Sequence, residues 1–256
     1  DTLDIGDVVH ETLERFFSRL QTTPGEPVDL SDYDFEMLEM QLLTAALDAE
    51  AELDLSYDSP FYTTWKSHLL AGLATPAEND HYDASTTGQP APESEHSRRD
   101  RGFFLRFLEE EYSNDSELHP AWFETPVGFD HDTPTFELPL PDGTTATISG
   151  VIDRIDITQD VTSEPASVFD YKTGSTNLKR TVEGVEFQLP LYAIAATHGI
   201  ATTTDQPSAA ITVDAHFYDI DVPNGVSRKG PLSERVGDGP ADPSYEAFLE
   251  DLTPRR

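Results

Sequence analysis

The sequence contains no cysteine, has only four lysines, and lacks any long apolar run. Without cysteine the chain cannot form a disulfide, a cysteine zinc site or a cysteine-held iron–sulfur cluster. No stretch approaches the ~18 apolar residues of a membrane span, and none has the pattern of a signal peptide, so we expect a cytoplasmic protein with no membrane partner. Because the chain begins at Asp1 within an expected helix, we also expect it to be a piece of a longer polypeptide.

Positive charge is scarce, with 16 basic residues against 49 acidic ones and a formal net charge of -33. The hydrophobic content of 37% is too high for a disordered acidic chain, so the acids must cover the surface of a folded protein. Such a surface is typical of a halophile, where added carboxylates keep proteins hydrated in a salt-loaded cytoplasm. In molar salt the Debye length falls to ~3 Å, so the net charge does not exclude nucleic acid as a partner.

Hydrophobic periodicity divides the chain into a helical part and a strand-rich part. Apolar residues recur at helical spacing in four segments of the first 115 residues, which are 5–20, 34–53, 61–74 and 102–112. Residues 76–100 are rich in Pro, Ser, Thr and Asp, which indicates a flexible loop. On the first helix, His10 flanks the apolar stripe and should point inward.

From about residue 120 the period changes to two, which indicates strands. The expected strands are 121–130, 144–158, 166–174 and 208–222, with a helix over 184–198 between the last two. We therefore predict a mixed α/β fold with a helical region at 1–115 and a sheet-containing core with a C-terminal extension at 116–256.

Two of the expected strands carry acids among apolar neighbours. Alternation places Asp153 of "GVIDRID" on the face of Val151 and Ile155, and it places Asp170 and Lys172 of "VFDYKTG" together. A buried carboxylate is costly unless it is paired or binds a metal, and two together suit a hard divalent cation, Mg²⁺ by preference. Asp156 should face the other side with Arg154, so we leave it out of the metal site.

These acids could also be ordinary surface charge, because acids are abundant throughout this chain. The triplet "DYK" alone would more often be a salt bridge at a strand end than a catalytic group. However, it is the only place where an acid stands two residues before a lysine. Gln188 and Tyr192, four apart in "QLPLY", share one helix face shortly after it. Tyr192 could be an ordinary core aromatic, but Gln188 has no packing reason to be there.

"GVIDRID", "DYKTG" and "QLPLYA", in this order and after a histidine-bearing helix, closely resemble the RecB-like branch of the PD-(D/E)XK nuclease superfamily. The motifs cover residues 150–193, and 1–222 fits the family's order of elements. The resemblance implies a restriction-endonuclease-like fold, in which helices flank a mixed central sheet. It also implies a metal-dependent DNA nuclease, as in RecBCD- and AddAB-type helicase–nucleases.

The resemblance assigns roles to individual residues. It implies that Asp153, Asp170 and the backbone carbonyl of Tyr171 bind Mg²⁺ or Mn²⁺, and that His10 adds a further ligand. Lys172 would position the attacking water. The remaining matches are Glu124, in the place of the family's upstream acid, and Gln188 and Tyr192, which would orient the lysine and contact DNA. Many relatives hold an iron–sulfur cluster, so this chain should belong to the cluster-free group.

DNA must also be bound, and the few basic residues are grouped. Lys179 and Arg180 follow the "DYKTG" turn, and a second group precedes or begins the helix at 102–112, namely Arg98, Arg99, Arg101 and Arg106. Ordinary solvated surface charge is an equally good interpretation of the second group. No lysine follows a glycine, so the chain has no P-loop, and a helicase partner would be another domain or subunit.

Two other functions compete with a nuclease as explanations of this sequence. A non-catalytic DNA-binding or scaffold module could keep the nuclease fold after losing activity, but loss of activity usually removes the lysine or a metal-binding acid. A purely structural acidic protein would leave the ordered motifs unexplained. The sequence therefore favours an Mg²⁺-dependent deoxyribonuclease, and we expect it to be the exonuclease module of a larger helicase–nuclease or DNA repair or recombination protein.

Overall fold

A computed structural model describes ten parts of the chain: residues 2–53, 60–73, 101–127, 136–139, 143–159, 166–173, 176–183, 185–204, 213–221 and 225–236. The expected loop at 76–100, with Arg98 and Arg99, lies outside these residues. The chain divides into two compact units. The first unit comprises Asp1–Arg19, Asp29–Asp115 and Ile220–Val226, and the second comprises Leu20–Val28, Ser116–Asp219 and Ser227–Arg256.

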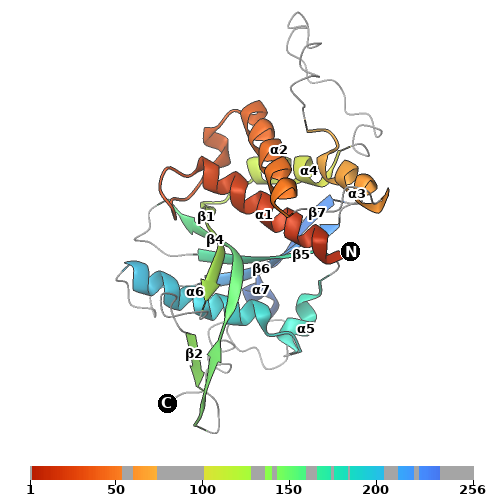
Figure 1. Cartoon of the computed structure of the whole chain (residues 1–256). Helices are drawn as coiled ribbons and strands as arrows, with labels where there is room; N and C mark the ends of the chain where they lie inside the picture. The colour runs from red at the N-terminus through yellow and green to blue at the C-terminus, as the bar shows by residue number, and fades with distance from the viewer. Residues whose placement is uncertain are drawn as a thin grey trace, which may run out of the picture. The chain divides into compact units, whose positions relative to one another are not determined.

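The first unit is helical, as the periodicity predicts. Its elements are α1 (Thr2–Leu20), the short 3₁₀ helix η1 (Leu30–Asp32), α2 (Phe35–Glu52), α3 (Pro60–Leu70) and α4 (Phe103–Tyr112) (Figure 1). The apolar stripe of α1 is buried at Val9, Leu13 and Phe16. Asp34 caps α2, because its side chain accepts a hydrogen bond from the backbone N–H of Met37.

Apolar packing and peripheral ion pairs hold these helices together. The ring of Phe17 on α1 meets that of Phe107 on α4 edge to face, with centroids 6.2 Å apart. At the rim, Arg19 pairs with Asp48 at 2.5 Å. Lys66 of α3 pairs with the buried carboxylate of Glu50 on α2 at 2.6 Å. The apolar core supplies most of the stability, since ion pairs open to solvent, such as that of Arg19 with Asp48, contribute little.

The second unit contains most of a mixed sheet with the strand order β1-β4-β5-β6-β7, in which the end of β6 and the start of β7 are assigned to the first unit. Its strands are β1 (Leu118–Val127), β4 (Gly150–Thr158), β5 (Ala166–Lys172), β6 (Val213–Asp221) and β7 (Gly225–Lys229). β4 is antiparallel to β1 and β5, whereas β5 and β6 are parallel. A parallel pair needs a crossover, and α6 (Gln188–Thr204) provides it. The mixed α/β fold expected from the sequence is confirmed.

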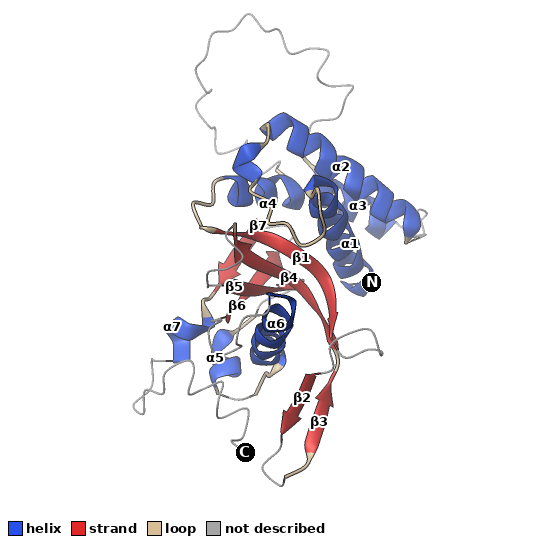
Figure 2. Ribbon diagram, turned by 90° about the vertical axis from the view of Figure 1, so that its left-hand side faces the viewer, coloured by secondary structure: helices blue, strands red, loops and turns tan. Residues whose placement is uncertain are grey.

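Helix α6 lies along one face of the sheet (Figure 2). Leu189, Ala193 and Ala196 of the helix are buried in one cluster with Val168 of β5 and Phe217 of β6. The small alanines allow the helix to approach the sheet closely. This packing fixes the helix beside the strands that carry the "DYK" and "GVIDRID" motifs.

A two-stranded ribbon, β2 (Phe136–Pro139) and β3 (Thr145–Ile148), extends from the end of β4 (Figures 1 and 2). The expected strand at 144–158 is therefore divided at Ser149 into β3 and β4. The helix expected at 184–198 begins instead at Gln188 and runs to Thr204. Its start is delayed because the N–H groups of Val185 and Glu186 bond to the carbonyl of Arg180. Two short helices, α5 (Leu178–Val182) and α7 (Leu232–Val236), were not expected.

The segment after α1 is fastened to β1. Gln21 donates a hydrogen bond to the carbonyl of Ala121, and the N–H of Val28 bonds to the carbonyl of Pro120 at 2.9 Å. Gly25 has φ +83°, and a Cβ there would lie 2.6 Å from Nε1 of Trp122. Only glycine satisfies both the left-handed backbone and this close approach.

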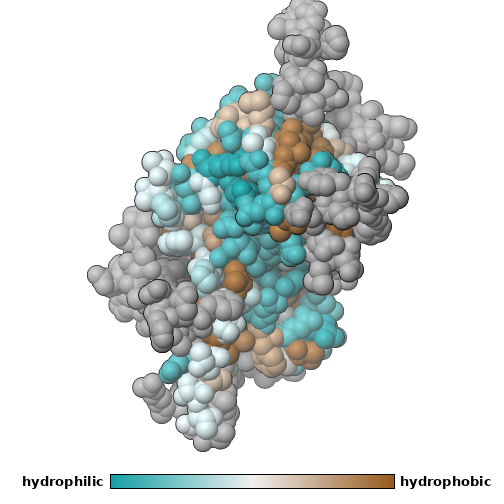
Figure 3. Space-filling view, in the orientation of Figure 1, coloured by the Kyte–Doolittle hydropathy of each residue, from teal (hydrophilic) through white to brown (hydrophobic). Residues whose placement is uncertain are grey.

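No described helix is both long enough and apolar enough to span a bilayer. Hydrophilic side chains occupy much of the described surface visible in Figure 3, as the composition predicts.

Candidate metal and catalytic centre

The pairing of β4 with β5 brings two acids to the same place. Arg154 is the partner of Phe169, and Ile155 is the partner of Val168, so the next step of the antiparallel register sets Asp153 opposite Asp170. Paired residues share a face of the sheet. Asp153 is 7% exposed and Asp170 is fully buried. Two carboxylates in such surroundings need positive charge or hydrogen-bond donors to stay ionised.

Asp170 receives both from a compact network. One oxygen of its carboxylate lies 2.9 Å from Nζ of Lys172. The other accepts a 3.3 Å hydrogen bond from the side-chain nitrogen of Gln188. Lys172 in turn donates to Oε1 of Gln188 at 3.1 Å, and Gln188 donates to the hydroxyl of Tyr192 at 2.9 Å. The four residues named in the sequence analysis on two separate motifs thus form one hydrogen-bonded group.

Asp153 is held differently, by the backbone. One of its carboxylate oxygens accepts a 2.6 Å hydrogen bond from the N–H of Tyr171 on the neighbouring strand. A charge-assisted bond of this kind orients the carboxylate. The backbone of Tyr171 thus lies beside Asp153, where its carbonyl was expected to supply a ligand.

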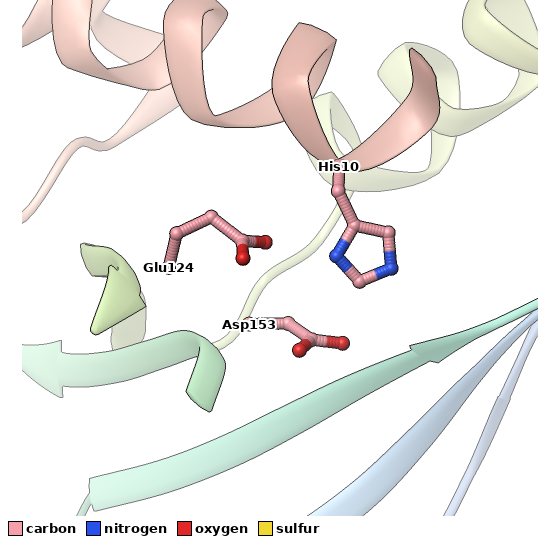
Figure 4. Close-up of side chains that lie close together, drawn as sticks. All are labelled: His10, Glu124 and Asp153. Atoms are coloured by element: carbon pink, nitrogen blue, oxygen red, sulfur yellow. The ribbon is translucent and has the colours of Figure 1, made fainter. Parts of the chain in front are cut away.

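Glu124 lies on β1 close to Asp153. Carboxylate oxygens of the two residues lie within 4.8 Å of one another (Figure 4). Glu124 has φ 42°, the only positive φ of a non-glycine residue in the described part of the chain. Such a backbone is disfavoured for a side chain of this kind and often marks a functional position. This backbone could not be predicted, because strand periodicity indicates a regular β1.

The pKa of Tyr192 is raised by its surroundings, which include three nearby acids. Burial raises the pKa of its phenol, a hydrogen bond from Gln188 lowers it, and the charges of Asp153, Asp170 and Glu124 raise it further. The hydroxyl therefore stays protonated at neutral pH. The ring also packs on Gly150, where a Cβ would meet Cε1 of Tyr192 at 3.3 Å. The first letter of "GVIDRID" thus has a packing role that we did not anticipate.

Asp156 is engaged with Arg154, which shares its face of β4, as alternation predicts. Its carboxylate pairs with Arg154 through two bonds of 2.5 and 2.6 Å, and both side chains are buried. The guanidinium of Arg154 lies 4.7 Å from the ring centroid of Phe169, a cation–π contact. The ring of His216 stacks on the same Phe169 at 4.8 Å. Burial lowers the pKa of His216 to about 4; Asp214 opposes the shift, and Arg228 and Arg154 add to it.

A further polar cluster secures the chain that follows "DYKTG". Asp219, the β6 partner of Lys172, accepts hydrogen bonds from the N–H and hydroxyl of Thr176 and pairs with Lys229. Lys229 also donates to the carbonyl of Thr176 at 2.9 Å. Sequence reasoning missed this cluster, because it depends on the pairing of strands distant in the chain.

The residues expected to bind DNA are mostly engaged with acids. Lys179 lies 3.5 Å from Glu183, and Arg180 lies 2.6 Å from Glu186, both at exposed positions where such pairs are weak. Arg101 of the first unit pairs with Glu109 at 2.8 Å. Their role in DNA binding remains a prediction, as does that of Arg98 and Arg99. Half-buried His10 lies on α1 in the first unit.

The donor set suits a hard divalent cation. Glu124, Asp153 and Asp170 offer carboxylate oxygens, which Mg²⁺ and Mn²⁺ prefer, and the chain has no thiolate to attract a softer metal.

Comparison with known proteins agrees with this chemistry. No curated protein matches the chain. The family model described as the PD-(D/E)XK nuclease superfamily matches residues 1–252. Proteins of this superfamily generally use divalent metals to cleave nucleic acid, and the mixed sheet with flanking helices is the fold expected of them. Because the match spans nearly the whole sequence, the chain belongs to the PD-(D/E)XK nuclease superfamily.

Proposed function

We propose that the chain is a divalent-metal-dependent DNA nuclease module that hydrolyses phosphodiester bonds. The observation that carries the proposal is the position of Lys172, which bonds at once to the carboxylate of Asp170 and to Oε1 of Gln188. A lysine used only as a counter-ion needs no second, neutral partner. Here the amide fixes the direction of the ammonium, as a group acting on a substrate requires.

The metal ligands we propose are His10, Glu124, Asp153 and Asp170, together with the carbonyl of Tyr171. In this proposal His10 would add an imidazole nitrogen to the carboxylate ligands. Mg²⁺ or Mn²⁺ suits these donors. When bound, such an ion would offset the negative charge of the acids and of the phosphate. It would also lower the pKa of bound water, so that hydroxide forms near neutral pH.

The side chains of the network have distinct tasks in this proposal. Lys172 holds the attacking water by hydrogen bonding and stabilises negative charge that develops on the phosphate oxygens. Gln188 accepts a hydrogen bond from the ammonium of Lys172 and keeps it in place. Its side-chain nitrogen also donates to the hydroxyl of Tyr192, which remains a neutral phenol. Asp153 is oriented by the N–H of Tyr171 before any substrate arrives, so little reorganisation is needed.

The wider setting is also part of the proposal. The order of the motifs supports a RecB-like nuclease, acting as the exonuclease module of a helicase–nuclease in DNA repair or recombination. The net charge of -33 supports an origin in a halophile and a cytoplasmic location. We further propose that residues 1–115 form the helical region and 116–256 the nuclease core. A tethered helicase would raise the local concentration of DNA, which the few cations of this chain bind weakly in salt.

A non-catalytic scaffold is the alternative, and titration calorimetry with Mn²⁺ separates the two. The nuclease should bind the ion and, in Mg²⁺, degrade end-labelled linear DNA in high KCl. Resistance of closed circular DNA would identify an exonuclease. A chain that binds neither Mn²⁺ nor Mg²⁺ and leaves every DNA intact would support the scaffold instead.

A further inference from the structure

The loop between α5 and α6 presents apolar side chains to solvent. Val185 is 54% exposed and Phe187 is 47% exposed. Among the large hydrophobic residues that the structure describes, only Met40 and Leu47 on α2 are comparably exposed, at 44% each. Burying an exposed phenylalanine ring is favourable, so a ring held in water is available for a ligand.

Hydrogen bonds hold residues 185–187 of this loop in place. The N–H groups of Val185 and Glu186 bond to the carbonyl of Arg180 at 2.9 and 3.3 Å. The side chains of Arg180 and Glu186 pair as well, at 2.6 Å. The carbonyl of Phe187 accepts the N–H of Leu191 in the first turn of α6 at 3.0 Å. The backbone of Phe187 is therefore already positioned before a ligand binds, which lowers the entropic cost of binding.

Phe187 directly precedes Gln188, which bonds to Lys172, Asp170 and Tyr192. Successive Cα atoms are about 3.8 Å apart, so the base of the Phe187 side chain lies one residue from the network where we place the scissile phosphate. A nucleotide attached to that phosphate would bring its base near this ring.

The charge of the chain makes an apolar contact valuable. Lys179 and Arg180 are exposed near this loop, but each already pairs with a glutamate. Phosphate binding weakens steeply with salt because it depends on counterion release. Stacking of a base on an aromatic ring has no such dependence and is tolerant of sequence. A DNA-binding protein with 16 basic residues against 49 acidic ones needs a contribution of this kind.

We propose that Phe187, flanked by Val185, is a stacking platform for an unpaired base of the DNA strand next to the cleavage site. The base must be unpaired, because a ring reaches the face of a base only where the stack is open. The site would thus favour single strands and frayed ends over intact duplex. The inference rests on the proposed function, in that DNA is taken as the substrate.

Fluorescence anisotropy with a labelled oligo(dT) tests this site. Ca²⁺ replaces Mg²⁺ as a hard cation with oxygen ligands, and gels of the same samples report any cleavage. Phe187→Ala should weaken binding roughly tenfold, by the same factor in low and in high KCl, while Phe187→Trp keeps the affinity. Leu47→Ala, an equally exposed truncation on α2, should change nothing.

An oligonucleotide series with one abasic residue at each position in turn locates the contact. Wild type should lose affinity at one position, and Phe187→Ala should show no further loss there. Equal affinities of wild type and Phe187→Ala, or a loss that persists at every abasic position, would overturn the stacking platform. The proposed nuclease function is judged separately, by degradation in Mg²⁺, so it can fail or hold independently of Phe187. A chain that binds no DNA at any salt concentration contradicts both.

Discussion

The side-chain nitrogen of Lys172 donates a 3.1 Å hydrogen bond to Oε1 of Gln188, which links the end of β5 to the first turn of α6. The same amide donates to Asp170 and to Tyr192, so one side chain sets the relative positions of an acid, a base and a phenol. Disturbing Gln188 should therefore affect the chemistry more than the fold.

Replacing Gln188 by alanine should lower the rate of DNA cleavage about tenfold or more, because the ammonium of Lys172 loses its fixed direction. Gln188 is exposed, so the melting temperature should change little. Initial rates at saturating DNA, together with thermal melts, check this. An unchanged rate would mean that Asp170 alone positions the lysine.

A side chain at position 150 should lower activity by displacing Tyr192. A methyl group there lies 3.3 Å from Cε1 of the tyrosine ring, so Gly150→Ala must displace the ring by a few tenths of an ångström. We expect a measurable loss of activity with little loss of stability. Gly25→Ala is the comparison, since it meets Trp122 at 2.6 Å and has φ +83°. It should cost about 1–3 kcal/mol in unfolding free energy measured with urea.

Metal binding should distinguish two acids that lie three residues apart. Asp153→Asn should abolish or strongly weaken Mn²⁺ binding in calorimetry, because it removes one of the carboxylates near Glu124. Asp156→Asn should leave the number of bound ions unchanged while destabilising the fold by about 3–5 kcal/mol, because Arg154 remains buried without its full partner. The opposite pattern would place the metal on the other face of the sheet.

Stability should fall in mild acid because of His216. Its pKa is about 4 in the folded protein against an ordinary value of 6.5, so the unfolded chain binds the extra proton between these pH values. The free energy of unfolding therefore decreases as pH falls from 6.5 to 4, by a few kcal/mol at most. Urea titrations across this range should show a shallower pH dependence for His216→Gln than for wild type, with exposed His68→Gln as the control.

Much of the fold could be predicted, because it follows from local patterns. Strand alternation put Asp153, Asp170 and Lys172 on one face, and the observed register of β4 and β5 agrees. The spacing of Gln188 and Tyr192 put them on one helix face, where they hydrogen-bond. Their catalytic roles remain predictions.

The rest depends on contacts that no local pattern reveals. The left-handed backbone of Glu124 arises within a strand that looks regular in sequence. The stack of His216 on Phe169 and the hold of Asp219 on Thr176 require the β5–β6 register. The short loop before α6, with its exposed Phe187, is set by hydrogen bonds to Arg180. Each of these features depends on tertiary contacts, which the hydrophobic periodicity of the sequence does not reveal.

The most direct measurement is the release of label from end-labelled linear DNA in Mg²⁺ by wild type, Lys172→Ala and Lys66→Ala. The two lysines are matched, since their side chains are 35% and 38% exposed and each pairs with a buried carboxylate. Both variants should lose similar stability. The nuclease assignment predicts that wild type and Lys66→Ala degrade DNA and that Lys172→Ala does not. Undiminished degradation by Lys172→Ala would contradict it.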